Sequence, residues 1–224
     1  MNSNQITLQR LAVSLFLSVS VSAVTAAAPL KPGVERWPIK TSVAPGADLA
    51  HPKQIAFPDL VSLEDPPGVT HNDSRYQSNL IPPFENSENL KEGDIVSTTG
   101  WIHLVAGEAD GDFHIQVSDS KSSGNRCLIV EVPKDDPAFE SDEKLRARCS
   151  KVRKFITEKV LLGATPSESG TVIKEPVFVK VTGQLFFDDA HVGDKPRGKK
   201  GMKAATLWEL HPVTDIKLAH PPTN

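Results

Sequence analysis

Alternating apolar and polar positions predict β-strands in the second half of the chain. The clearest segment is 112–118, where Phe113, Ile115 and Val117 share one face and the intervening positions are polar. Strict alternation is the pattern of a strand with one buried face. Further segments rich in Val, Ile, Thr and aromatic residues cover 94–105, 126–132, 176–187 and 204–211. We therefore expect five strands, with 126–132 covered because it is apolar on both faces.

One helix is predicted between the third and fourth strands. Its apolar stripe at helical spacing consists of Leu145, Cys149, Val152, Ile156 and Val160. Asp136 is the predicted N-cap, with Pro137 at the first helical position, and Gly163 is the predicted stop.

This order of elements defines the expected fold. Three strands, one helix and two strands is the order of the OB-fold, a five-stranded Greek-key barrel that commonly binds ligands at the loops after strands one and four. Gly100 and Gly183 lie inside predicted strands, where a small barrel needs bends or bulges. We predict a mainly β fold, a five-stranded OB-like barrel with one helix between strands three and four. Another small β-barrel, or a sandwich with an inserted helix, is the alternative.

The N-terminal region has a different composition. Residues 1–26 have the pattern of a secretory signal peptide, with Arg10 before an apolar run and predicted cleavage near Ala26. The run is shorter than the roughly 20 residues of a membrane-spanning helix. We therefore expect a periplasmic or secreted protein with no transmembrane segment in the mature chain.

A proline-rich stretch separates this leader from the barrel. Ten of the 18 prolines lie between Pro29 and Pro83, and proline fixes φ and removes a backbone donor. Residues 27–92 are thus predicted to be an extended arm or linker, acting as a tether or a wrapping strap, with a partner-binding arm as the alternative. The barrel domain is assigned to 93–218 and a short tail to 219–224.

Charge and cysteine content narrow the functional classes. The formal net charge is -3, which gives no global attraction to nucleic acid or anionic lipid. The two cysteines, Cys127 and Cys149, form an even pair, and in an oxidising compartment we expect a disulfide between them. Two buried thiols are the alternative.

Carboxylates and histidines occur in pairs at three places. Asp112 and His114 share one strand face, and Glu209 and His211 do the same. Imidazole with carboxylate suits Zn, Mn or Fe and also suits acid–base chemistry. The candidate metal ligands are Asp112, His114, Asp188, His191, Glu209 and His211, and the same set without Asp188 supplies the catalytic candidates. The competing interpretation is that these residues hydrogen-bond within the barrel and stabilise it.

A basic loop follows the predicted fourth strand. Its cations are Lys195, Arg197, Lys199, Lys200 and Lys203. Because OB barrels bind oligonucleotides or sugars near this loop, we expect it to bind an anionic polymer, with Trp101 and His103 as additional contacts. An ordinary solvated loop is the alternative.

Three motifs resemble a broad family of uncharacterised secreted bacterial proteins. They are Asp110-Gly111-Asp112-Phe113-His114, Phe186-Phe187-Asp188-Asp189-Ala190-His191 and Glu209-Leu210-His211-Pro212. The resemblance covers roughly residues 93–217, the extent of one domain. It implies an OB-type barrel and brings no established activity.

The sequence favours a binding or envelope-associated accessory module over an enzyme. It contains no nucleophile-elbow motif, P-loop or dinucleotide fingerprint, and a divalent metal is the one cofactor that its residues suggest. The expected partner is an oligonucleotide, an acidic glycan or another component of the cell envelope. A metal-dependent, nuclease-like hydrolase is the first alternative, and a purely structural protein is the second.

Overall fold

The computed structural model describes residues 35–223 and confirms a mainly β fold. Its long strands are β2 (Ile95–Gly107), β3 (Phe113–Ser120), β4 (Ser123–Val132), β5 (Thr171–Phe187) and β6 (Ala204–Leu218), and they are preceded by the two-residue β1 (Lys53–Gln54). Each long strand overlaps one predicted segment. The predicted signal peptide, residues 1–26, lies outside the described residues.

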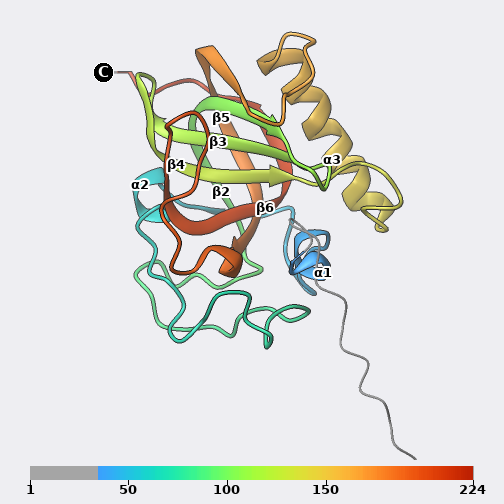
Figure 1. Ribbon diagram of the computed structural model, residues 1–224, viewed down its shortest axis with the longest axis vertical. Coiled ribbons are helices and arrows are strands. Elements are labelled where there is room, and N and C mark those ends of the chain that lie inside the picture. The colour runs from blue at the N-terminus through green and yellow to red at the C-terminus, as the bar shows by residue number, and fades with distance from the viewer. Residues whose placement is uncertain (1–34, 224) are drawn as a thin grey trace, which may run out of the picture.

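The strands form one mixed six-stranded sheet in the order β1-β2-β3-β4-β6-β5 (Figure 1). An additional pairing between β2 and β5 joins the ends of the series, so the five long strands form a closed ring. β4 pairs with β6 in parallel, whereas the other pairings among the long strands are antiparallel. Closure gives the sheet an inner face and an outer face.

Side-chain alternation distributes residues between these faces. On β3, Ile115 and Val117 belong to the main hydrophobic core, so His114 points to the outer face. The same alternation on β6 places Glu209 and His211 on the outer face. These polar side chains are nevertheless buried, because the arm and the β5–β6 loop cover this part of the barrel.

The predicted helix is present, but it begins later than expected. α3 (Glu143–Phe155) continues into a π-helical turn, η1 (Ile156–Val160), and all members of the predicted apolar stripe are buried. The N-cap prediction is wrong. The Asp142 side chain caps α3 by accepting hydrogen bonds from the backbone N–H groups of Lys144 and Leu145. Asp136 instead caps a separate turn, accepting from the N–H of Ala138.

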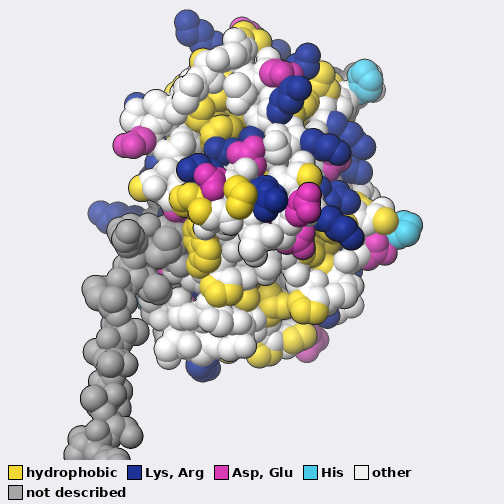
Figure 2. All heavy atoms as spheres, turned by 90° about the vertical axis from the view of Figure 1, so that its right-hand side faces the viewer, with side chains coloured by type: hydrophobic (Ala, Val, Ile, Leu, Met, Phe, Trp, Pro, Cys, Tyr) yellow, Lys and Arg dark blue, Asp and Glu magenta, His cyan; other side chains and the backbone are white. Residues whose placement is uncertain are grey.

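The surface that carries α3 has interspersed charges. Figure 2 shows Lys and Arg side chains next to Asp and Glu side chains on this face of the molecule. Such a mixture is typical of a solvated helix surface. Within residues 35–223, no helix combines the length and the apolar character needed to cross a bilayer.

The described part of the arm, residues 35–92, packs along the barrel (Figure 1). Its short helices are α1 (Trp37–Lys40) and α2 (Phe57–Leu60). Leu60 and Val61 are buried in the same hydrophobic cluster as the barrel strands, and Phe84 stacks on Trp208 with ring centroids 6.4 Å apart. This part of the arm is therefore a strap that contributes to the core.

A buried ion pair fixes the strap to the end of β5. Arg36 and Glu92 are both fully buried, and two guanidinium N–H groups reach the carboxylate oxygens at 2.7 Å each. The same carboxylate accepts the backbone N–H groups of Phe187 at 2.9 Å and Ile81 at 2.7 Å. Arg36 also donates to the carbonyl oxygen of Phe187 at 2.7 Å. Distant parts of the chain are thus joined at one point.

The predicted disulfide is absent, because Cys127 and Cys149 are both free and buried. Cys127 packs with Ile129 and Ala204 in a small outer cluster, whereas Cys149 on α3 belongs to the main core. The two thiols therefore lie on opposite sides of β4. A disulfide requires Cβ atoms about 4 Å apart that face one another.

Candidate functional site

A cavity of about 430 Å³ opens on the outer face of the barrel, between the β2–β3 turn and the β5–β6 loop. Its charged and titratable lining consists of Glu35, Lys40, Glu108, Asp110, His114, Glu131, Asp188, His191, Arg197, Lys199 and Glu209. The structure thus brings four of the predicted acid–histidine residues into one wall. The other two, Asp112 and His211, lie behind that wall. We call this space the charged cavity.

Three side chains of the site form a row across adjacent strands. His114 on β3 is the cross-strand partner of Glu131 on β4. The pairing of Val130 with Leu210 places His211 on β6 at the next position beside Glu131. His114 Nδ1 lies 2.8 Å from Glu131 Oε1, and His211 Nδ1 lies 3.2 Å from Oε2. One carboxylate therefore joins two imidazoles.

His211 is fully buried, and carboxylates approach both of its nitrogens. Nε2 lies 3.3 Å from Asp112 Oδ2, and Nδ1 lies 3.8 Å from Glu209 Oε2 in addition to its contact with Glu131. No described residue forms a well-aligned hydrogen bond with either nitrogen or with Asp112 Oδ2. Buried polar atoms are normally satisfied, so these atoms retain the capacity to bind a further group.

Sequence reasoning missed Glu131. It is the one charged residue in the apolar segment 127–132, and alternation places it on the same face as Cys127 and Ile129. The sequence did contain a sign that Glu131 belongs to a site. It is a charged residue on a strand expected to be covered, and a buried carboxylate needs a partner.

Two cations of the basic loop form ion pairs with carboxylates of the same chain. Arg197 lies between Asp188 and Glu209, with Nη1 2.6 Å from Glu209 Oε1. Lys199 Nζ lies 3.0 Å from Glu108 Oε1. Two of the five predicted ligand-binding cations are therefore engaged in ion pairs, whereas Lys195, Lys200 and Lys203 are exposed.

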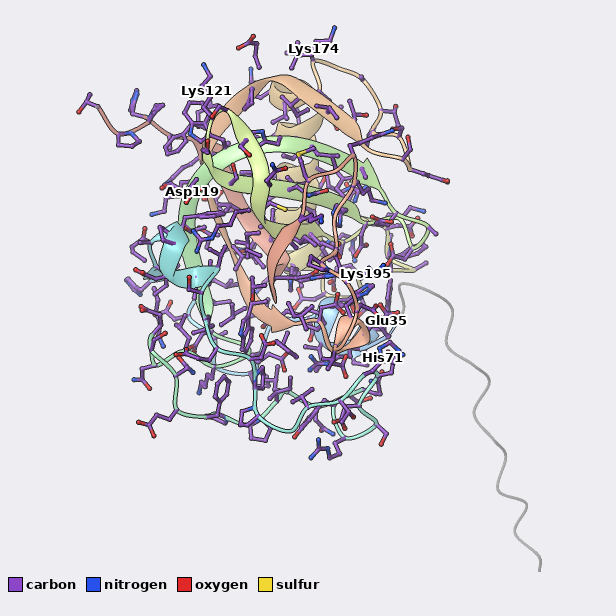
Figure 3. The ribbon with its side chains drawn as sticks, turned by 60° about the vertical axis from the view of Figure 1, so that its left-hand side comes forward. Glu35, His71, Asp119, Lys121, Lys174 and Lys195 are labelled. Carbon is purple, nitrogen blue, oxygen red and sulfur yellow. The ribbon has the colours of Figure 1, made fainter. Side chains whose placement is uncertain are left out.

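Lys195, one of the exposed loop cations, lies apart from two lysines elsewhere on the surface. In Figure 3, Lys195 lies at the same end of the molecule as Glu35 and His71, away from Lys121 and Lys174 near the top. His191, at the end of η2 (Asp189–His191), is held at the rim of the charged cavity, with Nδ1 2.9 Å from Asp194 Oδ2.

The arm completes the charged cavity. Lys40 of α1 is 5 % exposed, and its ammonium lies 3.1 Å from Glu35 Oε1 and 5.7 Å from the Phe186 ring centroid. No local pattern in the proline-rich segment marked these two residues as part of a site. Their contribution follows from the folding of the arm across the barrel.

Trp101 and His103, the other predicted contacts, do not line the charged cavity. Trp101 packs on Phe178 with ring centroids 4.9 Å apart, and the Lys121 ammonium lies 5.5 Å from its centroid. His103 is buried, and its Nε2 lies 2.9 Å from Ser118 Oγ. Both side chains are therefore engaged in packing or hydrogen bonding away from this cavity.

Burial and neighbouring charges shift several pKa values. Burial opposes a charge on His211, but the nearby carboxylates outweigh it and raise the pKa of His211 well above its usual value. Burial also opposes a charge on His114, but the neighbouring carboxylates, above all Glu131, outweigh it and raise the pKa of His114. Although burial disfavours its charge, the two histidines hold the pKa of Glu131 well below its usual value. Burial, followed by the charge of Asp112, raises the pKa of Asp110 to about 6.

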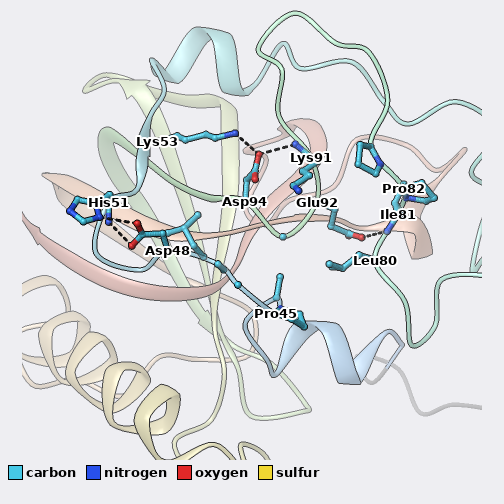
Figure 4. Close-up of a pocket in the computed structure, with 16 residues that line it drawn as sticks. Pro45, Asp48, His51, Lys53, Leu80, Ile81, Pro82, Lys91, Glu92 and Asp94 are labelled. Carbon is cyan, nitrogen blue, oxygen red and sulfur yellow. Dashed lines mark hydrogen bonds and ion pairs between the residues drawn. The ribbon is translucent and has the colours of Figure 1, made fainter.

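A second cavity, of about 440 Å³, lies between the arm and the start of β2 (Figure 4). Glu92 in its lining pairs with Arg36, and two further pairs lie within the lining. Lys53 Nζ lies 2.8 Å from Asp94 Oδ2, and His51 Nδ1 lies 2.8 Å from Asp48 Oδ2. Within the described chain, none of its lining side chains has a buried polar atom without a partner. The charged cavity therefore offers the stronger chemistry.

Comparisons with known proteins give no family. No family model and no curated protein matches the chain. Among solved structures, it is similar to Entamoeba histolytica asparaginyl-tRNA synthetase, with 16 % identity and a TM-score of 0.30 over 59 % of this chain and 22 % of that one. The same synthetase in complex with asparaginyl-adenylate gives 14 % identity and a TM-score of 0.31 over 63 % and 25 %. The chain spans a quarter or less of these proteins, and scores this low carry no functional argument.

Proposed function

We propose that the protein is an exported binding module, built on an OB-like Greek-key barrel, that holds a short acidic glycan in the charged cavity. Three features support the barrel type. The long strands close in the order β2-β3-β4-β6-β5, β4 and β6 pair in parallel, and α3 lies between β4 and β5 in the sequence. The leader pattern in residues 1–26 and the resemblance to secreted bacterial proteins support export.

The position of the charged cavity supports ligand binding. The β2–β3 turn and the β5–β6 loop flank it, and these correspond to the loops after strands one and four, where OB barrels bind oligonucleotides or oligosaccharides. Its volume of about 430 Å³ falls within the range of small-ligand sites, about 300–1,000 Å³.

The mixed polarity of the cavity wall is the observation that carries the proposal. Lys40, His114, Arg197 and Lys199 contribute hydrogen-bond donors to this wall. These groups can donate to carboxylate or hydroxyl oxygens, while the wall carboxylates can accept from hydroxyls. A sugar acid has both kinds of group. An oligonucleotide fits less well, because no Phe, Tyr or Trp among residues 35–223 lines the cavity for base stacking.

Calorimetric titration with a galacturonate trimer, and with the neutral galactose trimer as its control, tests this proposal. We expect the acidic trimer to bind and His114→Gln to weaken binding at least about tenfold, the cost of one lost charge-assisted hydrogen bond. The double variant Lys195→Met/Lys200→Met should bind like the wild type. The proposal fails if neither sugar binds, or if the double variant loses binding while His114→Gln retains it.

A metal-dependent hydrolase is the second candidate, favoured by the donor atoms that Asp112, Glu131 and His211 bring together. Hydrolysis of the same trimer, abolished by a chelator, would support it over binding alone. If His114→Gln and His211→Gln lower only the free energy of unfolding, the acid–histidine residues have a purely structural role.

A further inference from the structure

His211 and its carboxylates form a site of their own behind the charged cavity. Asp112, Glu131 and His211 each offer a ligand atom, and these atoms lie within 4.8 Å of one another. His211 Nδ1 faces Glu131 at 3.2 Å and Glu209 at 3.8 Å, whereas Nε2 faces Asp112 at 3.3 Å. Since His211 is fully buried without a well-aligned hydrogen bond, the imidazole is positioned but not satisfied.

These distances suit a bound cation. Metal–nitrogen and metal–oxygen bonds of about 2.1 Å place neighbouring donors about 3.4 Å apart in a tetrahedral site. The separation of His211 Nε2 from Asp112 Oδ2, 3.3 Å, is close to that value, and Glu131 supplies the third donor of the group. Glu131 also lines the charged cavity, so a cation that enters from the cavity meets this carboxylate first.

The charge of the site favours a divalent ion. Its enclosed carboxylates are Asp112, Glu131, Asp188 and Glu209, and its enclosed permanent cations are Lys40 and Arg197. With both imidazoles neutral, four negative and two positive charges leave two negative charges, which a divalent cation neutralises; in the metal-free protein, protons on His114 and His211 supply the same two charges. An uncompensated buried charge is strongly unfavourable.

We infer that the protein binds one divalent cation of the Zn²⁺ class through Asp112, Glu131 and His211. Glu209, whose Oε2 lies 3.8 Å from His211 Nδ1, is the positioning residue, because a carboxylate on the second ring nitrogen fixes the orientation of a metal-binding imidazole. One nitrogen with carboxylate oxygens suits Zn²⁺ or Mn²⁺, whereas Ca²⁺ prefers an all-oxygen set. The site goes beyond the proposed glycan binding, which needs no metal.

The test uses the full chain, purified after export without a chelator or a histidine tag. Elemental analysis should find about one equivalent of metal, and Co²⁺ added to the metal-depleted chain should give the visible absorption of a tetrahedral site. Glu131→Gln and Asp112→Asn should each weaken Zn²⁺ binding more than about 100-fold, and Glu209→Gln about 10- to 100-fold. The matched control is Asp194→Asn, which alters an exposed Asp–His pair and should leave Zn²⁺ binding unchanged.

A wild-type chain that purifies without metal and leaves the Co²⁺ spectrum as that of the free ion overturns the inference. So does a folded Glu131→Gln variant that binds Zn²⁺ like the wild type. Should that variant fail to fold, the wild-type Co²⁺ spectrum decides. Glycan titration of the metal-depleted chain separates the two proposals, because failure of the metal site leaves glycan binding intact.

Discussion

Removal of Glu92 should destabilise the whole fold, because it would leave Arg36 buried without its partner. Both side chains are fully buried, and breaking such a pair by removing one member typically costs about 3–5 kcal/mol. Glu92→Ala also removes the acceptor of the Phe187 and Ile81 backbone N–H groups, each of which adds about 1 kcal/mol or more. A total of at least ~5 kcal/mol is a large part of a typical domain stability of about 5–15 kcal/mol.

A double-mutant cycle isolates the ion pair from these backbone contacts. Glu92→Gln keeps an oxygen that can accept a backbone N–H, and Arg36→Met removes the buried cation. We expect the double variant to be less destabilised than the sum of the two single variants by about 2 kcal/mol, a typical coupling energy for residues in contact. Lys53→Met is the surface control, because the Lys53 side chain is 51 % exposed in its pair with Asp94, and it should cost less than about 1 kcal/mol.

Guanidinium unfolding, followed by tryptophan fluorescence, measures these free energies, since Trp208 is fully buried. The reasoning is refuted if Glu92→Ala costs no more than Lys53→Met. Strict additivity of Arg36→Met and Glu92→Gln would also refute it, because the two side chains would then be energetically independent.

Two further predictions concern the cysteines and the helix cap. Burial raises the pKa of Cys149 to about 12 and also raises the pKa of Cys127. Both thiols should therefore be protonated and unreactive to iodoacetamide at pH 8 in the native protein, and mass spectrometry should show two adducts after denaturation. A mass two hydrogens lower, with no adduct, would instead reveal a disulfide. Asp142→Ala should cost about 1 kcal/mol of unfolding free energy by loss of the N-cap, whereas Asp136→Ala should cost distinctly less, and equal costs would contradict the assignment of the cap to Asp142.

Local patterns predicted most of the fold. They succeeded for the segments whose pattern allowed a single interpretation. β3, at 113–120, overlaps the predicted segment 112–118 because its alternation is strict. The helix start was predicted wrongly because Asp136 and Asp142 both offer N-cap chemistry, and a separate turn between them decides the outcome. The cysteine pairing depended on which side of β4 each thiol occupies, which spacing along the chain does not reveal.

The site was predicted only as separate pairs. Two-residue spacing placed Glu209 and His211 on one strand face, and the structure has both on the outer face of β6. Their meeting with Glu131 depends on the parallel pairing of β4 with β6, which joins Ile129 to Glu209 across a long stretch of sequence. Loop cations such as Arg197 were also ambiguous, because the sequence does not show which carboxylates they meet after folding.

The anchoring of the arm has a consequence for the order of folding. During synthesis the arm emerges first, yet Arg36 donates to a carbonyl 151 positions later, and the backbone N–H of Asp73 donates to Asp189, 116 positions later. Contacts so distant in sequence form late, because the intervening loop must close first. The arm must therefore remain undocked until β5 has been synthesised. Until then, its many prolines disfavour helices and strands that would compete with docking. Protection of the arm from proteases would accordingly report that the barrel is complete.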